Sequence, residues 1–293
     1  MLEDFLQHLE YEKRYSAHTI ASYRLDIVQY QSFLAESYDD IAIEESSPPI
    51  IRSWMVSMME RELTARTVNR KISSLKSFFR WAKKYRDINT DPTKQLKLPK
   101  TSKRLPVYVE EDQMDELGTA NFFEDDFEGL RNRLIVELFY QTGIRCSELI
   151  DLKTNNIDTQ RGTIKVLGKR NKERIIPVGE GVLSLLKHYL ALRPAPADSE
   201  SNAFTFLTAK GLKLYPKLVY RVVNTYLGKV SALRKKSPHV LRHTFATHML
   251  NRGADLNAIK ELLGHSSLAA TQVYTHNSIE KLKEIHRKAH PKG

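Results

Sequence analysis

The sequence has almost no cysteine, since Cys146 is the only one in 293 residues. A single thiol excludes an internal disulfide and a cysteine-rich zinc site, which is typical of proteins in a reducing compartment. No apolar run approaches the roughly 20 residues that a membrane-spanning helix needs. The opening MLEDFLQHLEYEK is acidic and amphipathic, unlike a secretory signal. We therefore expect a soluble, cytoplasmic protein that makes no membrane contact.

Acidic residues are also scarce relative to basic ones. The chain has 46 Lys and Arg against 35 Asp and Glu, which gives a formal net charge of +11 and a pI near 9.5. Such an excess favours polyanionic partners, of which nucleic acid is the most common. The length suits two domains, each with its own core.

The spacing of apolar residues predicts a mainly α fold with a small β-sheet. Residues 1–88 have helical periodicity and form the first predicted domain. Residues 89–106 carry three prolines and five basic residues without periodicity, which predicts a linker. Residues 107–293 form the second domain, helical except for two short strands in TIKVLGKRNKERIIPV and one in AFTFLT.

The helix predicted from Thr64 to Tyr85 has two distinct faces. Its apolar face consists of Val68, Ile72, Leu75, Phe79 and Ala82. Its opposite face consists of Arg66, Arg70, Ser73, Ser77, Arg80 and Lys84. From Arg61 to Arg86 there are nine basic residues and one acid, Glu62. Because solvated helix faces usually mix both signs, this polar face is predicted to contact DNA phosphates.

The stretch SPHVLRHTFATH places His239, Arg242 and His243 on one face of a helix, with Pro238 in its first turn. Two histidines four residues apart are a possible zinc pair, but the HExxH pattern is absent and Arg242 would repel a metal. A packed structural histidine is common for any one of them. Arginine and imidazole donors together match phosphate oxygens, so we favour an anion at this face.

A second arginine, Arg145, follows Gly143 in a predicted turn between helices. Its neighbours are apolar, and an unpaired charge there would be costly. We therefore expect Arg145 to have an anionic partner, either Glu148 or a ligand phosphate. Lys169 lies in the basic turn between the two predicted strands, where most lysines are simply solvated.

Gly264 is predicted to end a helix, and His265 follows it directly. Tyr274 comes nine residues later, in a stretch rich in serine and threonine. Neither residue alone indicates a function, because single tyrosines and histidines most often serve packing.

Taken together, five motifs stand in one order along the chain. They are TGIRCSEL with Arg145, GKRNKERIIP with Lys169, HVLRHTFATH with His239 and Arg242, LGH with His265, and VYTH with Tyr274. This ordered set resembles the tyrosine recombinases of the phage-integrase superfamily, and among them the Xer branch. Two positions depart from the pattern: Arg170 replaces a frequent glycine, and Cys146 replaces a frequent aliphatic residue.

The resemblance implies a helical, SAM-like core-binding domain and an α/β catalytic domain, which together form a C-shaped clamp on duplex DNA. It implies site-specific cutting and rejoining through a 3′-phosphotyrosyl intermediate. In that scheme Tyr274 is the nucleophile, His239 the base and Lys169 the acid. The remaining catalytic residues bind the phosphate: Arg145, Arg242 and His265. Neither a metal nor another cofactor is expected.

The resemblance also implies partners. These are a duplex recombination site and either further copies of this chain or a paired recombinase in a tetrameric synapse, joined by the helix after Tyr274. A cell-division DNA translocase is a candidate regulator that the residues themselves do not identify. Alternatives remain open: a type IB topoisomerase, a mobile-element integrase, or a DNA-binding regulator without catalysis.

Overall fold

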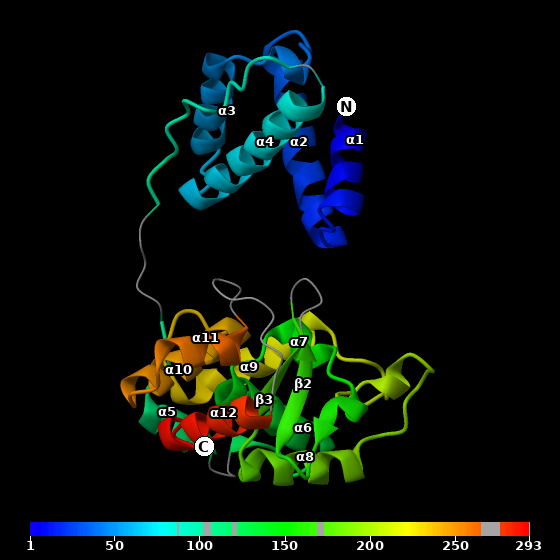
Figure 1. The fold of residues 1–293 in the computed structure, drawn as a ribbon, viewed down its shortest axis with the longest axis vertical. Coiled ribbons are helices and arrows are strands. Elements are labelled where there is room, and N and C mark those ends of the chain that lie inside the picture. Colours follow the sequence, from blue (N-terminus) through cyan, green and yellow to red (C-terminus); the bar gives the residue numbers. More distant parts are fainter. Residues whose placement is uncertain (87, 102–106, 119–121, 169–172, 265–275, 293) are drawn as a thin grey trace. The chain divides into compact units, whose positions relative to one another are not determined.

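The computed structural model describes residues 1–293 except 87, 102–106, 119–121, 169–172, 265–275 and 293, and it leaves the side chains of 276–281 undescribed. The chain divides into two compact units, Met1–Arg104 and Leu105–Gly293 (Figure 1). No helix in the described residues is both long enough and apolar enough to cross a lipid bilayer.

The N-terminal unit is helical. Its elements are α1 (Leu2–Gln7), a π-helical turn η1 (His8–Glu12), α2 (Ala17–Ser37), a 3₁₀ turn η2 (Ile43–Glu45), α3 (Pro48–Glu60) and α4 (Ala65–Tyr85). Local chemistry starts the longer helices. The Ser16 and Thr64 hydroxyls accept the backbone N–H groups three residues ahead, while Pro48 occupies the first turn of α3.

The apolar face predicted for α4 forms the centre of this unit's core, so that prediction is confirmed. Val68, Ile72 and Phe79 are fully buried, and they belong to one cluster with Phe5 and Tyr30 from the first two helices. Burial of each large apolar side chain contributes about 1.5–3 kcal/mol, which fixes the face that α4 turns toward solvent.

The C-terminal unit packs helices around a small sheet. Its helices are α5 (Glu111–Gly118), α6 (Phe127–Thr142), α7 (Cys146–Ile150), α8 (Glu180–Leu192), α9 (Pro216–Val230), α10 (Pro238–Asn251), α11 (Leu256–Leu263) and α12 (His276–Ala289), with 3₁₀ turns η4 (Thr154–Asn156) and η6 (Ser201–Ala203). The antiparallel sheet has the order β1 (Ile157–Asp158), β2 (Thr163–Leu167), β3 (Glu173–Pro177). The two strands predicted in TIKVLGKRNKERIIPV are β2 and β3, paired with Val166 opposite Arg174.

The strand predicted in AFTFLT is wrong. The segment begins in the 3₁₀ turn η6 and makes only isolated bridges, such as Lys153 with Phe204. Its apolar side chains are buried, which explains the strand-like pattern. Its N–H groups, however, find single partners: Thr205 donates to the Leu152 carbonyl, and Leu207 donates to the Tyr189 hydroxyl.

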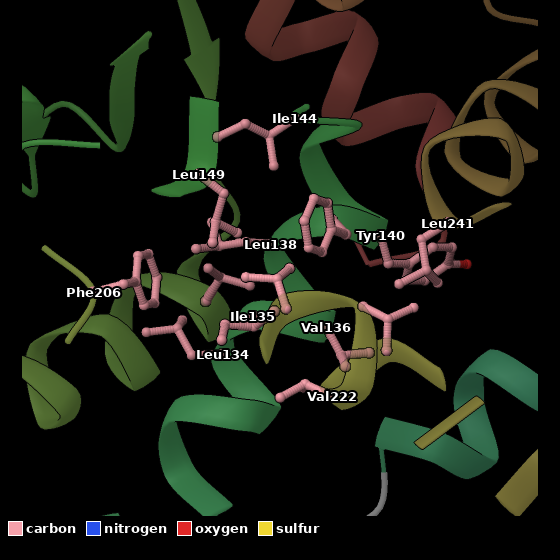
Figure 2. Close-up of a cluster of buried hydrophobic side chains, with 14 of the residues drawn as sticks. Leu134, Ile135, Val136, Leu138, Tyr140, Ile144, Leu149, Phe206, Val222 and Leu241 are labelled. Atoms are coloured by element: carbon pink, nitrogen blue, oxygen red, sulfur yellow. The ribbon is translucent and has the colours of Figure 1, made fainter. Parts of the chain in front are cut away.

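The core of this unit lies along α6, which is buried on nearly every side. Figure 2 shows Leu134, Leu138 and other α6 side chains packed together with Ile144 and Leu149 from the segment that follows. Ile144 and Leu149 are fully buried, and Arg145 lies between them in the sequence. Burial of its flanks therefore holds the Arg145 turn in place.

Candidate active site and nucleic-acid interface

The turn that carries Arg145 depends on Gly143. Gly143 ends α6 in the left-handed conformation, with φ of 58°, and its N–H donates to the Phe139 carbonyl at 3.1 Å. A Cβ at this position would lie 2.6 Å from Leu263 and 2.7 Å from Phe245. Both the backbone angle and the space therefore require glycine. Arg145 follows as the N-cap of α7.

Of the two partners expected for Arg145, the structure shows Glu148. Arg145 Nη1 donates to Glu148 Oε1 at 2.7 Å, and the Arg145 backbone N–H donates to Glu148 Oε2 at 2.8 Å. Arg145 Nη2 donates to the Gly264 carbonyl at 3.0 Å. The side chain stays 21% exposed, whereas that of Glu148 is 2% exposed. Arg145 therefore remains open to a ligand.

A further arginine, Arg174 on β3, completes the group, and sequence reasoning missed it. Both of its terminal nitrogens donate to the two Glu148 oxygens at 2.7 Å each. Burial alone would raise the pKa of Glu148, but Arg174, with help from Arg145, lowers it to about 2. The sequence signal was only one more basic residue in NKERIIP.

Arg242 lies on α10 and is only 9% exposed. Its Nη1 donates to the Gly143 carbonyl and its Nη2 to the Leu263 carbonyl, the latter at 2.6 Å. Burial, followed by repulsion from Arg145 and Arg174, lowers the pKa of Arg242 to about 9. The guanidinium is therefore still charged at neutral pH, in a place where further positive charge is unfavourable.

Arg145, Arg174, Arg242 and Glu148 form what we call the arginine cluster. Three guanidiniums lie around one carboxylate, so the four side chains carry a net charge of +2. Because Arg242 is buried, water cannot screen its charge as it would at the surface. An anion bound beside Arg145 and Arg242 would remove this imbalance, and phosphate matches the arginine fork.

The α10 helix starts at Pro238, as predicted, and His239 is an exposed side chain in its otherwise buried first turn. Arg242 lies one turn further on. The other histidine of the zinc alternative, His243, is half-buried, and its Nε2 is 3.5 Å from the Thr247 hydroxyl. Among the residues that the structure describes, no three His, Cys, Asp or Glu side chains gather as metal ligands would.

The other three predicted catalytic residues, Lys169, His265 and Tyr274, lie outside the described residues. The chain on both sides of Lys169 is described as β2 and β3, and His265 directly follows Gly264 at the end of α11. Their places relative to the arginine cluster stay predictions.

The C-terminal helix α12 packs on its own unit. His286 Nε2 donates to the Gln141 carbonyl at 2.7 Å, and His290 Nε2 donates to the Tyr140 carbonyl at 3.1 Å. These carbonyls belong to the last turn of α6, where helical partners are missing. Burial lowers the pKa of both histidines, that of His290 to about 2. Both are thus neutral caps of the helix that leads to Arg145.

The exposed face of α4 differs in one respect from its sequence pattern. Arg66, Ser73, Arg80 and Lys84 are exposed and Ser77 is half-buried, which matches the predicted polar face. Arg70, however, pairs with the buried Asp26 of α2. The α4 helix is thus less positively charged than its own residues suggest, because Asp26 of α2 compensates part of its charge. Within the described residues, Arg66 and Arg80 make no ion pair.

A second basic surface lies on α9, and sequence reasoning did not single it out. Its exposed side chains include Lys217, Tyr220 and Arg221, followed after the helix by Arg234 and Lys235. The Tyr220 ring is 41% exposed. Basic residues that alternate with exposed aromatic ones are typical of nucleic-acid contacts. The helical spacing of Lys217 and Arg221 is the signal that could have identified it.

Comparison with known proteins identifies the family of this chain. The model of the phage integrase family matches residues 108–281, and that of the phage integrase N-terminal SAM-like domain matches residues 2–85. The chain belongs to the phage integrase family. It is 38% identical to the tyrosine recombinase XerC of Chlorobaculum parvum, over 99% of this chain and 94% of that protein. It is also 38% identical to XerC of Mycobacterium sp. (strain JLS), over 100% and 99%.

The recombinase also resembles solved structures. One is the XerH site-specific recombinase bound to its palindromic difH substrate, with a TM-score of 0.72, 22% identity, and coverage of 97% of this chain and 82% of that one. Another is the Tn1549 transposon integrase with transposon right-end DNA, with a TM-score of 0.71, 20% identity, and coverage of 97% and 98%. These likenesses confirm the fold. With the XerC relatives, they make this protein a site-specific tyrosine recombinase of the Xer type.

Proposed function

We propose that this recombinase resolves chromosome or plasmid dimers in the cytoplasm by cutting and rejoining duplex DNA through a 3′-phosphotyrosyl intermediate on Tyr274. The observation that carries the proposal is the arginine cluster, with two positive charges that its single carboxylate does not neutralise. A scissile phosphate supplies the missing negative charge. The full-length similarity to XerC proteins supports the Xer role over a mobile-element integrase.

In the first step, the Tyr274 oxygen attacks phosphorus and the bond from phosphorus to the 5′ oxygen breaks. The phenol, with an ordinary pKa of about 10, must lose its proton during attack. His239, exposed at the start of α10, takes that proton. Lys169 gives a proton to the leaving 5′ oxygen. Rejoining is the reverse reaction with a new 5′ hydroxyl, so no ATP is consumed.

Arg145 and Arg242 bind the non-bridging oxygens and stabilise the charge that develops on them, and His265 donates a further hydrogen bond. Because two guanidiniums already face the phosphate, the scheme needs no metal ion. Arg145 is the more exposed of the two and makes the first contact, while the buried Arg242 is fixed by the Gly143 and Leu263 carbonyls.

The DNA duplex contacts both units. On α4 we propose that Arg66, Arg80 and Lys84 bind backbone phosphates, assisted by Ser73 and Ser77. Arg70 joins them only through the part of its side chain that Asp26 leaves exposed. On α9 the basic surface takes the same role.

Strand exchange requires four recombinase subunits, either copies of this chain or a paired recombinase. We propose that α12 links the subunits. It would leave α6 of its own subunit and pack against α6 of a neighbouring subunit. The histidines that cap α6 would then come from the neighbour. A cell-division DNA translocase is the proposed regulator of this assembly, on the strength of the Xer resemblance alone.

The decisive experiment uses a nicked suicide duplex that carries a Xer-type recombination site, because the nick traps the covalent intermediate. Wild type should give a covalent protein–DNA band on a denaturing gel, and Tyr274→Phe should give none while its DNA affinity is unchanged. Tyr11→Phe is the matched control: Tyr11 is 72% exposed in the other unit, so its band should persist. A band with Tyr274→Phe would refute the nucleophile. DNA binding without any band, even with a paired recombinase added, would favour a non-catalytic regulator.

A further inference from the structure

Arg174 has a hydrogen-bond partner for each of its side-chain nitrogens. It is the second residue of β3 and is 4% exposed. Its Nη1 and Nη2 donate to the two Glu148 oxygens, and its Nε donates to the Leu262 carbonyl at 2.9 Å. All three of its nitrogens therefore face the protein. Arg174 is not placed to bind a ligand itself.

Glu148 transmits the position of Arg174 to Arg145. The same carboxylate that receives the Arg174 fork also accepts the Arg145 side chain and the Arg145 backbone N–H. Rotation of the Glu148 carboxylate would break both hydrogen bonds from Arg145 at once, the one from its side chain and the one from its backbone N–H. A bidentate pair fixes the plane of the carboxylate as well as its location. The orientation of Arg145 thus depends on Arg174.

The end of α11 is the second element that Arg174 holds. Three consecutive carbonyls there each accept from a different arginine: Leu262 from Arg174, Leu263 from Arg242, and Gly264 from Arg145. A Cβ on Gly264, where φ is 64°, would come within 3.1 Å of Arg174 Cδ. The Arg174 side chain therefore packs directly against this helix end. It connects β3, α7 and α11 at one point.

We propose that Arg174 is a positioning residue for catalysis: by fixing Glu148 and the end of α11, it holds Arg145 and Arg242 in the geometry that receives the scissile phosphate. The inference rests on the proposed function. Arginine is required because a lysine ammonium is a point charge, which cannot bind both carboxylate oxygens and a carbonyl in one plane. Removal of Arg174 would leave Glu148 paired only with Arg145, so that Arg145 turns away from the phosphate.

The test compares single-turnover cleavage of the suicide duplex by saturating wild type, Arg174→Met and Arg174→Lys. Arg174→Met should cleave on the order of 10²-fold more slowly, as expected when one charge-stabilising contact is lost. Arg174→Lys should recover about tenfold, because it restores the charge without the fork. DNA affinity should stay within about threefold, since Arg174 is buried away from phosphates.

A buried arginine elsewhere in the same unit controls for simple destabilisation. Arg131 on α6 is 2% exposed and pairs with Glu128, but it is eleven residues, or about 16 Å of helix, before Thr142. Arg131→Met should lower the melting temperature and leave the cleavage rate of the folded protein unchanged. If Arg174→Met does not fold, Arg174→Lys carries the same comparison, because it keeps the buried charge.

A methylphosphonate at the scissile position separates positioning of the arginines from a general structural role. It lacks one negative charge, so it needs less stabilisation by Arg145 and Arg242. The deficit of Arg174→Met should therefore shrink from on the order of 10²-fold to less than about tenfold, and that of Arg145→Ala should shrink in parallel. Lys169→Ala should show no such recovery, since the leaving oxygen still needs its proton.

The outcomes distinguish this inference from the proposed function. If wild type forms no covalent product, the proposed function fails. If wild type cleaves and Arg174→Met cleaves equally fast, or if its deficit is the same on the natural and the methylphosphonate duplex, positioning by Arg174 is refuted. The positioning role is supported if Arg174→Met cleaves slowly only on the natural, charged phosphate and Arg174→Lys recovers part of the lost rate.

Discussion

The two units each bury one carboxylate among basic side chains, yet with different consequences. In the N-terminal unit Asp26, 1% exposed, pairs with Arg70 and Lys71, and the Arg70 side chain is 50% exposed. In the C-terminal unit Glu148 pairs with Arg145 and Arg174, and the third arginine of the cluster, Arg242, is 9% exposed. Water solvates the excess charge in the first unit, whereas in the second only Arg145 of the three arginines is appreciably exposed to water.

This difference separates a structural ion pair from a binding site. The Asp26 group joins α2 to α4, and Ser74 completes it by donating to the carboxylate at 2.7 Å. It is satisfied without a ligand. The arginine cluster also satisfies its carboxylate with hydrogen bonds, but its four side chains together carry a net charge of +2. Uncompensated charge in a place that water does not screen is therefore the better indicator of function.

The largest expected effect compares the two carboxylates. Glu148→Gln removes the carboxylate with which Arg145 and the buried Arg174 pair, so it should lower the free energy of unfolding by about 3–5 kcal/mol. Asp26→Asn should cost less, about 1–3 kcal/mol, because the exposed Arg70 turns to water and the buried Lys71 keeps its hydrogen bond to Gln29. Denaturant unfolding of the full chain measures both. Equal losses of unfolding free energy in the two variants would show that the exposure of the arginines around each carboxylate does not matter.

The next prediction compares one arginine from each unit: the first should affect the cleavage rate and the second the DNA affinity. Arg145→Ala should slow single-turnover cleavage by on the order of 10²–10³-fold, because it removes a charge stabiliser. Arg80→Ala on α4 should instead weaken DNA binding and reduce the slope of log affinity against log salt by about 0.9, the share of one phosphate contact. Cleavage of the suicide duplex tests Arg145→Ala, and binding titrations at several salt concentrations test Arg80→Ala. A loss below about tenfold for Arg145→Ala would make that residue structural.

The smallest effect is on pH and concerns α12 in the C-terminal unit. Folding lowers the pKa of His286 and His290, so the unfolded chain binds their protons more readily. Stability is therefore complete above about pH 6.5 and is lost as the pH falls below that value, by about 1.4 kcal/mol per pH unit for each histidine. The pKa of Glu148 is about 2, so its contribution is lost only in more acidic solution.

Hydrogen exchange of the 282–290 backbone, corrected for intrinsic rates, should reveal weaker protection at pH 5.5 than at pH 7.5. His290→Gln should reduce this dependence and leave the share of His286, because the amide keeps a donor and an acceptor without titrating. Exchange of the α3 backbone, Pro48–Glu60, is the internal control, since this helix of the N-terminal unit contains no histidine and its protection should not change. Equal protection at both pH values would contradict the assignment of the histidines as neutral caps.

Prediction from the sequence succeeded where local spacing decides the structure. The α4 faces, the two strands of TIKVLGKRNKERIIPV, the first turn of α10 and the helix end at Gly264 all follow from periodicity or from residue-specific backbone preferences. The pairing of Arg145 with Glu148 spans only three residues and was among the expected alternatives. The strand in AFTFLT failed because a tertiary partner, the Tyr189 hydroxyl, took the place of a neighbouring strand.

The sequence by itself determined the helical units, the basic surface of α4 and the order of motifs that marks the recombinase, because each depends on residues close together in the chain. Only the tertiary structure decided which charges compensate one another. Arg174 meets Glu148 across 26 residues, and Arg70 meets Asp26 across 44. Such pairs depend on how the apolar faces pack, and packing brings together side chains whose separation along the chain carries no signal.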